Sequence, residues 1–336
     1  VYTQSQGGNI RRLDAVFRQQ CESINPTPAT IVNFQELFPD YEGSGRLSRD
    51  IFRFNCSSPL RLSPHNSHTV LFGGNYLFRS YDRGDTWEII SPLLSTGDPE
   101  LADEESGGLT RDVTGAETHA TIITLAESPV RPGLIWAGTD DGRVHVTRDD
   151  GGSWTDVGRN LPEGVEGLWI SRVEPSHFQE GTAYISIDGH RSDNFQPWIF
   201  KTEDYGQSWE RITSGLPEGN PIYVVREDPK NPALLFAAGE FGVFFSVDGG
   251  ESWGPLGMGF PTVSTHDLFI HHRESDLIAG THGRSVWILD DFTALQQLTP
   301  EVMESDVHLF QQKTATKWQG ISRGATRGHK LFMGRN

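Results

Sequence analysis

The stretch TRDDGGSW, residues 147–154, decides how this sequence folds, because the chain repeats it. Three further copies read SYDRGDTW from residue 80, TEDYGQSW from residue 202 and SVDGGESW from residue 246. The four copies share the pattern Ser/Thr-x-Asp-x-Gly-x-Ser/Thr-Trp, which we call the box. Asp150 is replaced by Arg83, Tyr205 and Gly249 in the other copies, so only one acidic position is common to all. A calcium loop needs more fixed oxygen ligands than one per copy. The box is therefore interpreted as a turn.

Each box joins two predicted strands. Runs such as GVFFS, GRVHVT and WIFKT precede the boxes, and runs such as WERIT and WEIIS end or follow them. Alternating β-branched and aromatic residues on both sides of a Gly/Asp cluster indicate a β-hairpin. The Asp side chain can accept hydrogen bonds from backbone N–H groups, and Gly can adopt a positive φ without strain. The Trp is expected to bury a large apolar area against the neighbouring repeat. Structural roles are therefore expected for Asp82, Asp149, Asp204, Asp248, Trp87, Trp154, Trp209 and Trp253.

The repeating unit is longer than the box. Upstream of each box lies a strand, a polar turn, a short apolar strand ending near Gly, and the strand that enters the box, so each unit contains four strands. The boxes begin at residues 80, 147, 202 and 246, and their steps are 67, 55 and 44 residues. Periods of this size in an all-strand pattern are typical of propeller blades. The longer steps contain insertions at 91–117 and 188–197. The sequence therefore predicts an all-β propeller of four-stranded blades, with five to six blades in this chain, either as a ring or as part of a larger one.

The propeller is predicted to cover residues 1–300. A partial blade over 1–50 comes first, and further blades are centred near residues 87, 154, 209, 253 and 287. A turn of helix is expected only near 292–297. Residues 301–336 are predicted to be a linker or tail, which is basic because 307–336 contain six Lys or Arg and no Asp or Glu. Both ends of the sequence indicate a fragment of a longer polypeptide.

Composition excludes several classes of function. The formal net charge of −17 argues against a nucleic-acid or anionic-membrane partner. No run of 18 apolar residues is present, so no transmembrane span is predicted, and this chain contains no signal peptide. Cys21 and Cys56 can form one bridge or remain two free thiols. Histidines that face the predicted channel come from separate blades without the ligand spacing of a zinc site, so neither a metal nor a cofactor is predicted.

From about residue 54 to 300 the sequence resembles large secreted bacterial proteins with Asp-box (BNR) repeats, labelled sortilin-N-terminal-like or glycosyl hydrolase. The resemblance rests on the boxes together with the stretches RFNCSSPLRLSPHNSHTVLFGGNYLFRSYDRGDTWEIISP, ETHATIITLAESP and GTHGRSVWILDD. It implies an extracytoplasmic protein, periplasmic or secreted, with further blades before this region and a β-sandwich after it. The sequence departs from the family at Cys56, where a bulky aromatic residue is expected. It departs again at Leu93-Leu94, where an acidic residue is expected first.

Propellers usually bind their ligands on one face. Here that face, which we call the loop face, is built from the loops 73–76, 139–142, 188–195, 239–242 and 281–284. The predicted binding residues on it are Tyr76, Asp141, His190, Arg191, Phe195, Phe241, His282 and Arg284. His119, Arg172 and His266 lie near the starts of the innermost strands, close to the channel. Aromatic residues in such loops can stack on sugars or anchor a protein partner.

Glycoside hydrolysis would need two carboxylates flanking a cleft. The loop GTDDG resembles the acidic loop that carries a catalytic Asp in xyloglucan-cleaving tandem propellers, and this resemblance makes Asp140 the first candidate. Glu240 and Asp188 are the candidate partners. No spacing in the sequence supports one pairing over the other.

A sialidase is the less favoured hydrolase. That chemistry needs three arginines for the substrate carboxylate, with a Tyr nucleophile and a Glu. Arg172, Arg226 and Arg273 occupy repeated strand positions, but no matching Tyr/Glu pair stands out.

No loop contains a nucleophile–base pair, a metal spacing or a phosphate cradle, whereas the signals for the fold are dense. Fold alone does not confer a function. The sequence therefore favours a binding or scaffold propeller that recognises a protein, peptide or glycan through its loop face, with a glycoside hydrolase as the alternative. Another chain that completes the propeller or a larger assembly is a further expected partner.

Overall fold

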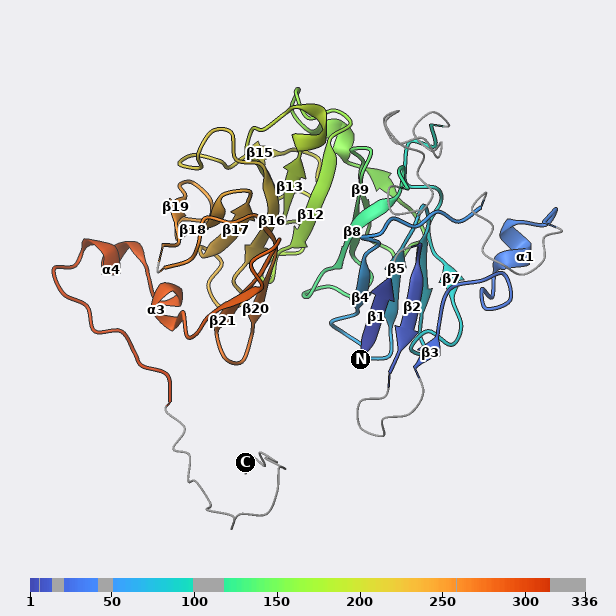
Figure 1. Ribbon diagram of the computed structural model, residues 1–336, viewed down its shortest axis with the longest axis horizontal. Coiled ribbons are helices and arrows are strands. Elements are labelled where there is room, and N and C mark those ends of the chain that lie inside the picture. Colours follow the sequence, from blue (N-terminus) through green and yellow to red (C-terminus); the bar gives the residue numbers. More distant parts are fainter. Residues whose placement is uncertain (6, 14–20, 42–50, 99–117, 258, 315–336) are drawn as a thin grey trace, which may run out of the picture.

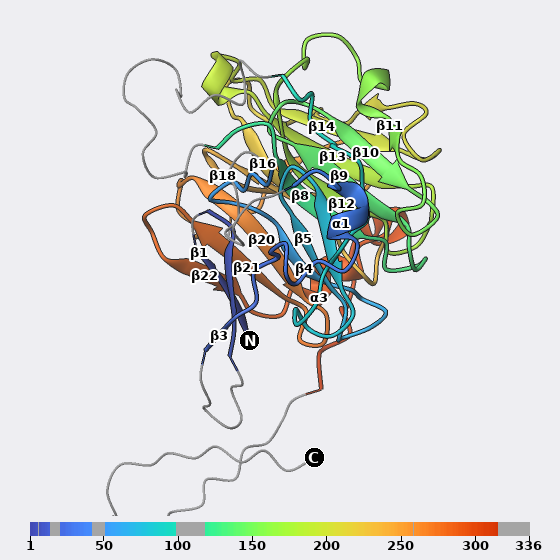
Figure 2. The ribbon, with the colours of Figure 1, turned by 90° about the vertical axis from the view of Figure 1, so that its right-hand side faces the viewer.

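The computed structural model describes residues 1–5, 7–13, 21–41, 51–98, 118–257 and 259–314. Their strands form six antiparallel sheets, each built from strands consecutive in the chain, which confirms the predicted all-β propeller. Figure 1 shows the sheets following one another in chain order, from blue β1–β3 through green β8 and β9 to brown β16–β18 and orange β20 and β21. In Figure 2 the first and last sheets lie toward the same side of the molecule.

Four of the six sheets have four strands, and the first and last have three. The first contains β1 (Tyr2–Ser5), β2 (Asn9–Arg12) and β3 (Glu22–Ser23). The second contains β4 (Leu60–Leu62), β5 (Val70–Gly73), β6 (Leu77–Ser80) and β7 (Glu88–Ile89). The third contains β8 (Ile122–Glu127), β9 (Ile135–Thr139), β10 (Val144–Thr147) and β11 (Thr155–Asp156). The fourth contains β12 (Trp169–Pro175), β13 (Ala183–Asp188), β14 (Trp198–Thr202) and β15 (Glu210–Arg211). The fifth contains β16 (Ile222–Glu227), β17 (Leu235–Gly239), β18 (Gly242–Ser246) and β19 (Gly254–Pro255). The sixth contains β20 (Thr265–His271), β21 (Asp276–Thr281) and β22 (Val286–Leu289).

Helix is scarce in the described residues, as the sequence predicts. The helices are α1 (Phe34–Leu37), α3 (Thr293–Gln296) and α4 (Pro300–Glu304), and two 3₁₀ turns are η1 (Gly158–Asn160) and η2 (His190–Ser192). The expected turn near 292–297 is α3, while α1 and α4 have no counterpart in the sequence-based expectation. Figure 1 shows all three helices outside the sheets.

Each box forms the turn between the third and fourth strands of its sheet. In the box at 246–253, Asp248 accepts hydrogen bonds from Ser246 Oγ at 2.6 Å, from the Ser252 N–H at 3.0 Å and from the Ser252 hydroxyl. The Ser246 oxygen accepts from the Gly250 N–H at 2.9 Å. The same carboxylate contacts recur at Asp82, Asp149 and Asp204. The turn is thus closed by its own side chains and backbone.

The box tryptophans connect successive sheets. Trp253 donates its indole N–H to the carbonyl of Ile212, at the end of the preceding sheet, at 2.7 Å. The other three indoles make the equivalent bond to Ile24, Ile90 and Val157. A buried indole usually finds such an acceptor, and here the acceptor always belongs to the neighbouring blade. The expected position of these tryptophans at blade–blade interfaces agrees with this geometry.

The box glycine serves the same interface. Gly250 has φ +98°, and a Cβ there would lie 2.6 Å from Ile212 Cδ1. At the corresponding place a Cβ on Gly84 would meet Ile24, and one on Gly206 would meet Val157. Glycine is therefore required twice, by the backbone conformation and by the close approach of the preceding blade.

The innermost strands carry the same irregularity. In β16 the pairing with β17 shifts between Ile222 and Val224, and shifts at the equivalent place interrupt β8, β12 and β20. The extra residues are Ile123 in β8, Ser171 in β12, Tyr223 in β16 and His266 in β20. A β-bulge bends its strand and redirects a side chain. Four bulges therefore set which side chains lie at the entrance of the channel.

Clusters of buried apolar side chains fill the spaces between successive sheets. The largest lies between the third and fourth sheets and includes Trp136, Phe200 and Trp209. The outward face of the last sheet differs, because Phe269, Val286 and Ile288 are between 54% and 60% exposed. Both cysteines are free and exposed. Within the part of the chain that the structure describes, no helix is long and apolar enough to cross a bilayer.

The tail predicted for residues 301–336 is described only as far as residue 314. Lys313 Nζ contacts the carbonyl and the carboxylate of Glu274 at 2.7 and 3.0 Å. Lys313 and then Arg273 lower the pKa of Glu274 to about 2. Glu274 lies in the turn between β20 and β21, at the opposite end of these strands from the loop face. Residues 315–336, and residues 99–117 of the predicted insertion, lie outside the described residues.

Candidate functional site on the loop face

Tyr223 occupies the bulge of β16 on the loop face and is only 8% exposed. Its hydroxyl donates a hydrogen bond to Glu240 Oε2 at 2.8 Å. Glu240 directly follows β17 and is half-buried. Burial first, and then this hydrogen bond, raises the pKa of Tyr223 above its ordinary value. The phenol is therefore a neutral hydrogen-bond donor at pH 7 rather than a nucleophile.

Asp188 lies at the end of β13, on the neighbouring blade. Its carboxylate contacts His190 Nδ1 at 2.7 Å and Arg191 Nη1 at 3.1 Å, and the residue is 4% exposed. The turn η2 places both partners, because it folds 190–192 back over the end of the strand. The Arg191 guanidinium lies 3.8 Å from the ring centroid of Trp169. Asp188 thus orients an imidazole and a stacked guanidinium toward the entrance of the channel.

Aromatic and imidazole rings continue across the entrance. His190 lies edge-on to Tyr223, with ring centroids 6.1 Å apart, and Tyr223 stacks on His266 at 4.5 Å. His266 meets His282 at 5.4 Å. His266 lies in β20 and His282 directly follows β21 of the same last sheet, so the expectation that these histidines come from separate blades is wrong for this pair. Burial first, and then His282, lowers the pKa of His266 below its ordinary value, so that ring is neutral at pH 7. We call the set Asp188, His190, Arg191, Tyr223, Glu240 and His266 the mouth cluster.

Asp140, the first candidate for catalysis, is enclosed. It has no exposed surface, and its carboxylate accepts hydrogen bonds from the Thr121 N–H at 2.7 Å and the Thr121 hydroxyl at 3.0 Å. Asn55 Nδ2 adds a contact at 3.4 Å. Burial raises the pKa of Asp140 to about 6, against the opposing effect of His119. Its neighbour Asp141 is 4% exposed and accepts from the Thr96 N–H at 2.7 Å.

The remaining predicted binding residues are spread over the loop face. Tyr76 packs edge-on against Phe38 and Phe52 in the core between the first two sheets. Phe195 and Phe241 are 48% and 53% exposed. Arg284 is exposed, and its carbonyl accepts a hydrogen bond from the Trp287 indole. His119 lies beside Trp169, with ring centroids 6.2 Å apart.

Two of the three arginines considered for a carboxylate site lie in the channel. Arg172 and Arg226 come from the neighbouring inner strands β12 and β16 and share one carboxylate oxygen of Asp267. Arg273 is 83% exposed and pairs with Glu274 outside the channel. The third arginine in the channel is Arg61 of β4, not Arg273. Arg61 interacts electrostatically with Arg172, Arg226 and Asp267.

Sequence reasoning missed Tyr223 and Trp169. Both lie at the starts of innermost strands, the position that drew attention to His266, but each is flanked by apolar residues and looks like an ordinary core residue. Tyr223 and His266 occupy the same bulge position in β16 and β20. The bulges are defined by strand pairing, which a single sequence does not reveal. Among the described residues, no three His, Cys, Asp or Glu side chains are grouped to hold a metal.

No known family model matches the sequence. The chain is 24% identical over 219 residues to a "Xyloglucanase" of Hypocrea jecorina (strain QM6a), which covers 59% of this chain and 25% of that protein. It is 25% identical over 135 residues to an "Oligoxyloglucan-reducing end-specific xyloglucanase" of Emericella nidulans, over 40% of this chain and 14% of that protein. The chain thus spans about a quarter or less of the curated relatives it matches.

Two solved structures of GH74 enzymes have a similar fold. A GH74 xyloglucanase from Xanthomonas campestris matches with a TM-score of 0.52 and 23% identity, over 68% of this chain and 36% of that one. An ancestral GH74 enzyme matches with a TM-score of 0.50 and 16% identity, over 68% and 28%. At these identities the likeness establishes the propeller fold and nothing about activity.

Proposed function

We propose that the loop face of this chain binds a glycan and that the mouth cluster hydrolyses a glycosidic bond in it. The observation that carries the proposal is the grouping of Glu240, Tyr223 and Asp188, from two neighbouring blades, with the ring of His266. Sugar sites combine flat rings for the sugar faces with carboxylates for the hydroxyl groups and the bond to be broken. The similarity to two proteins named as xyloglucanases supports a β-glucan, and xyloglucan is the first substrate to test.

Glu240 is the carboxylate that we assign to the reacting bond. It is the most exposed of the three candidate carboxylates, and the Tyr223 hydroxyl fixes one of its oxygens at 2.8 Å. Asp188 is the second carboxylate of the pair, and its contacts also orient His190 and Arg191 toward the sugar. Asp140 holds Thr121 at the start of β8, and in this proposal it supports the site without touching substrate.

Release of new reducing ends from xyloglucan tests the proposal. Glu240→Gln should lower the rate by about a hundredfold or more, the usual effect of removing an acid or base. Tyr223→Phe should retain part of the activity and shift its pH profile, because Glu240 loses its hydrogen-bond donor. Glu251→Gln, an exposed glutamate of the box at 246–253, is the matched control and should retain full activity. Equal rates for the Glu240 and Glu251 variants, or no turnover of any β-glucan by the wild-type chain, would show that the hydrolase assignment is wrong.

Binding without turnover is the second candidate function. Phe195 and Phe241 are about half exposed on the loop face, where a protein or peptide partner would cover them. Pull-down of a partner that Phe195→Ser and Phe241→Ser abolish, with no glycan bound at all, would favour a scaffold. A polysaccharide substrate is met outside the cytoplasm, so the proposal also places the protein in the periplasm or beyond the cell.

A further inference from the structure

Below the mouth cluster, the channel is lined by five charged side chains from four inner strands. They are Arg61 of β4, Arg172 and Glu174 of β12, Arg226 of β16 and Asp267 of β20. Each of the three arginines interacts electrostatically with both carboxylates. The mouth cluster does not include any of them, and the proposed hydrolysis does not use them.

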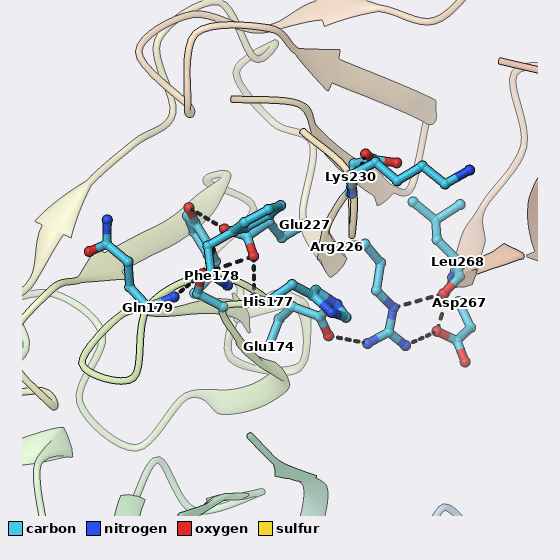
Figure 3. Close-up of polar contacts among 12 residues, drawn as sticks. Glu174, His177, Phe178, Gln179, Arg226, Glu227, Lys230, Asp267 and Leu268 are labelled. Carbon is cyan, nitrogen blue, oxygen red and sulfur yellow. Dashed lines mark hydrogen bonds and ion pairs between the residues drawn. The ribbon is translucent and has the colours of Figure 1, made fainter. Parts of the chain in front are cut away.

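Arg226 is fully engaged within this group. Its Nη1 contacts Glu174 at 2.6 Å, its Nη2 contacts Asp267 at 2.9 Å, and its Nε donates to the Leu268 carbonyl at 2.8 Å. Figure 3 shows this guanidinium held between the two carboxylates. Both negative charges are therefore already in contact with one cation.

Arg172 and Arg61 are poorly compensated by comparison. Arg172 contacts only the Asp267 oxygen that Arg226 also uses, at 2.9 Å, and its buried Nε has no hydrogen-bond partner among the described residues. Arg61 makes one long hydrogen bond, 3.4 Å, to the Leu125 carbonyl, and no described carboxylate lies within ion-pair distance of it. Buried cations are normally paired, but Arg61 has no paired anion and Arg172 shares its only one with Arg226.

The five charged side chains carry a net positive charge. Three arginines face two carboxylates, which leaves one positive charge. His177, 3.9 Å from Glu174, adds none, because burial lowers its pKa below the ordinary value. Burial first, and then repulsion by Arg226, lowers the pKa of Arg172 to about 9, and the same two causes lower the pKa of Arg61. Arg172, with a pKa of about 9, is protonated at pH 7, and a guanidinium such as that of Arg61 keeps its proton in proteins at this pH. The excess charge is therefore present at pH 7.

A ligand can reach this level of the channel. The Asp267 side chain, which contacts both Arg172 and Arg226, is 52% exposed. The Arg172 side chain retains 12% of its surface. Solvent therefore reaches this group beside Asp267 and Arg172.

We propose that Arg61 and Arg172 bind a carboxylate group inside the channel. A carboxylate carries the single negative charge that the site lacks, and guanidinium donors match its oxygens in geometry and charge. A phosphate would bring nearly two charges and overcompensate. The carboxylate can belong to an acidic sugar such as a uronate or to a small free acid. The proposal stands whether or not the mouth cluster is catalytic, because it concerns separate residues.

Titration calorimetry with sodium glucuronate, sodium acetate and neutral glucose at constant ionic strength tests this site. The wild-type chain should bind a carboxylate and not glucose. Arg61→Met should weaken binding by about tenfold or more, the usual scale for a charged hydrogen-bonded contact. Arg273→Met removes an exposed arginine outside the channel and is the matched control, for which the affinity should not change.

Asp267→Asn keeps the proposal falsifiable if removing an arginine damages the fold. The amide oxygen can still accept from both arginines, while the loss of one negative charge raises the excess from one positive charge to two. Carboxylate binding should therefore become several-fold tighter, a gain that structural damage would not produce. Binding of glucuronate alone identifies a sugar acid, and equal binding of acetate identifies a small free acid. No carboxylate binding by the wild type, or unchanged affinity in both the Arg61 and Asp267 variants, would overturn the proposal.

Discussion

At the scale of single residues, the box aspartates stabilise a turn through bonds that end on their own backbone and hydroxyl groups. We expect Asp248→Ala to lower the free energy of unfolding by about 1–3 kcal/mol, because it removes the acceptor of three hydrogen bonds. Glu251 in the same turn is exposed and has no side-chain hydrogen bond or ion pair with the described residues, so Glu251→Ala serves as control. Urea unfolding of both variants measures the difference, and equal midpoints would contradict the role given to Asp248.

The same residue predicts a pH dependence. The hydrogen bonds from Ser246 and Ser252 outweigh burial and lower the pKa of Asp248 below its ordinary value of 3.8. Its contribution is therefore complete above that value and is lost as the pH falls through the lower, folded pKa. The stability difference between wild type and Asp248→Ala should shrink on acidification.

Glu227 should show the opposite dependence. It is 2% exposed, with Ser176, His177 and Tyr184 as hydrogen-bond donors, and Figure 3 shows it beside His177. Burial outweighs these donors and raises its pKa from 4.5 to about 7. The folded chain therefore binds more protons than the unfolded chain between these values, and stability falls as the pH rises through that window.

Glu227→Gln removes this titration. The unfolding free energy of wild type relative to the variant should decline from pH 4.5 to pH 7.5, and denaturant unfolding at several pH values measures it. Glu251→Gln supplies the control profile. A difference that does not change with pH would mean that Glu227 is ionised in the folded chain.

At the scale of elements, the blades dock through the box glycine. Gly250→Ala must meet Ile212 Cδ1 at 2.6 Å and adopt φ +98°, whereas Gly249→Ala at φ +74° meets nothing within 4 Å. The other boxes already carry Arg83, Asp150 and Tyr205 at the position of Gly249, the fourth residue of the box, each with positive φ. We expect Gly249→Ala to cost about 1 kcal/mol of backbone strain.

Gly250→Ala should cost more, about 2–4 kcal/mol, because overpacking adds to the strain. Ile212→Val removes the Cδ1 atom that the new methyl group would meet. The double variant should therefore be more stable than the sum of the two single changes predicts, with thermal melts as the measurement. Strict additivity would place the cost within the turn and away from the blade interface.

Sequence patterns predicted these elements well because their causes are local. Each box contains its own acceptors, hydroxyls and glycine, so the turn, the strand on either side and the tryptophan interface can be expected from eight residues. The helical turn at α3 follows from a similar local signal. The bulges of the inner strands do not, because they arise from pairing between strands and from the curvature of the channel.

At the scale of the whole molecule, the candidate site is where prediction from sequence is least complete. Asp188, His190, Arg191, Glu240 and His282 were expected on the loop face and lie on it near Tyr223. The burial of Asp140 and the convergence of Arg61 with Arg172 depend on how five blades are placed around one channel, which no spacing in the sequence encodes. The expectation of a further chain that completes the assembly stays a prediction, and the exposed face formed by Phe269, Val286 and Ile288 is the surface to examine for it.

The central claim is that a glycan binds at the loop face, over the mouth cluster. Hydrogen–deuterium exchange with and without a xyloglucan oligosaccharide tests it most directly, because the four boxes lie away from this face and serve as an internal reference. The account predicts slower exchange in residues 188–195 and 239–242 and unchanged exchange in the boxes. Protection confined to the boxes or the outward face of the last sheet, or no protection anywhere at saturating ligand, would contradict it.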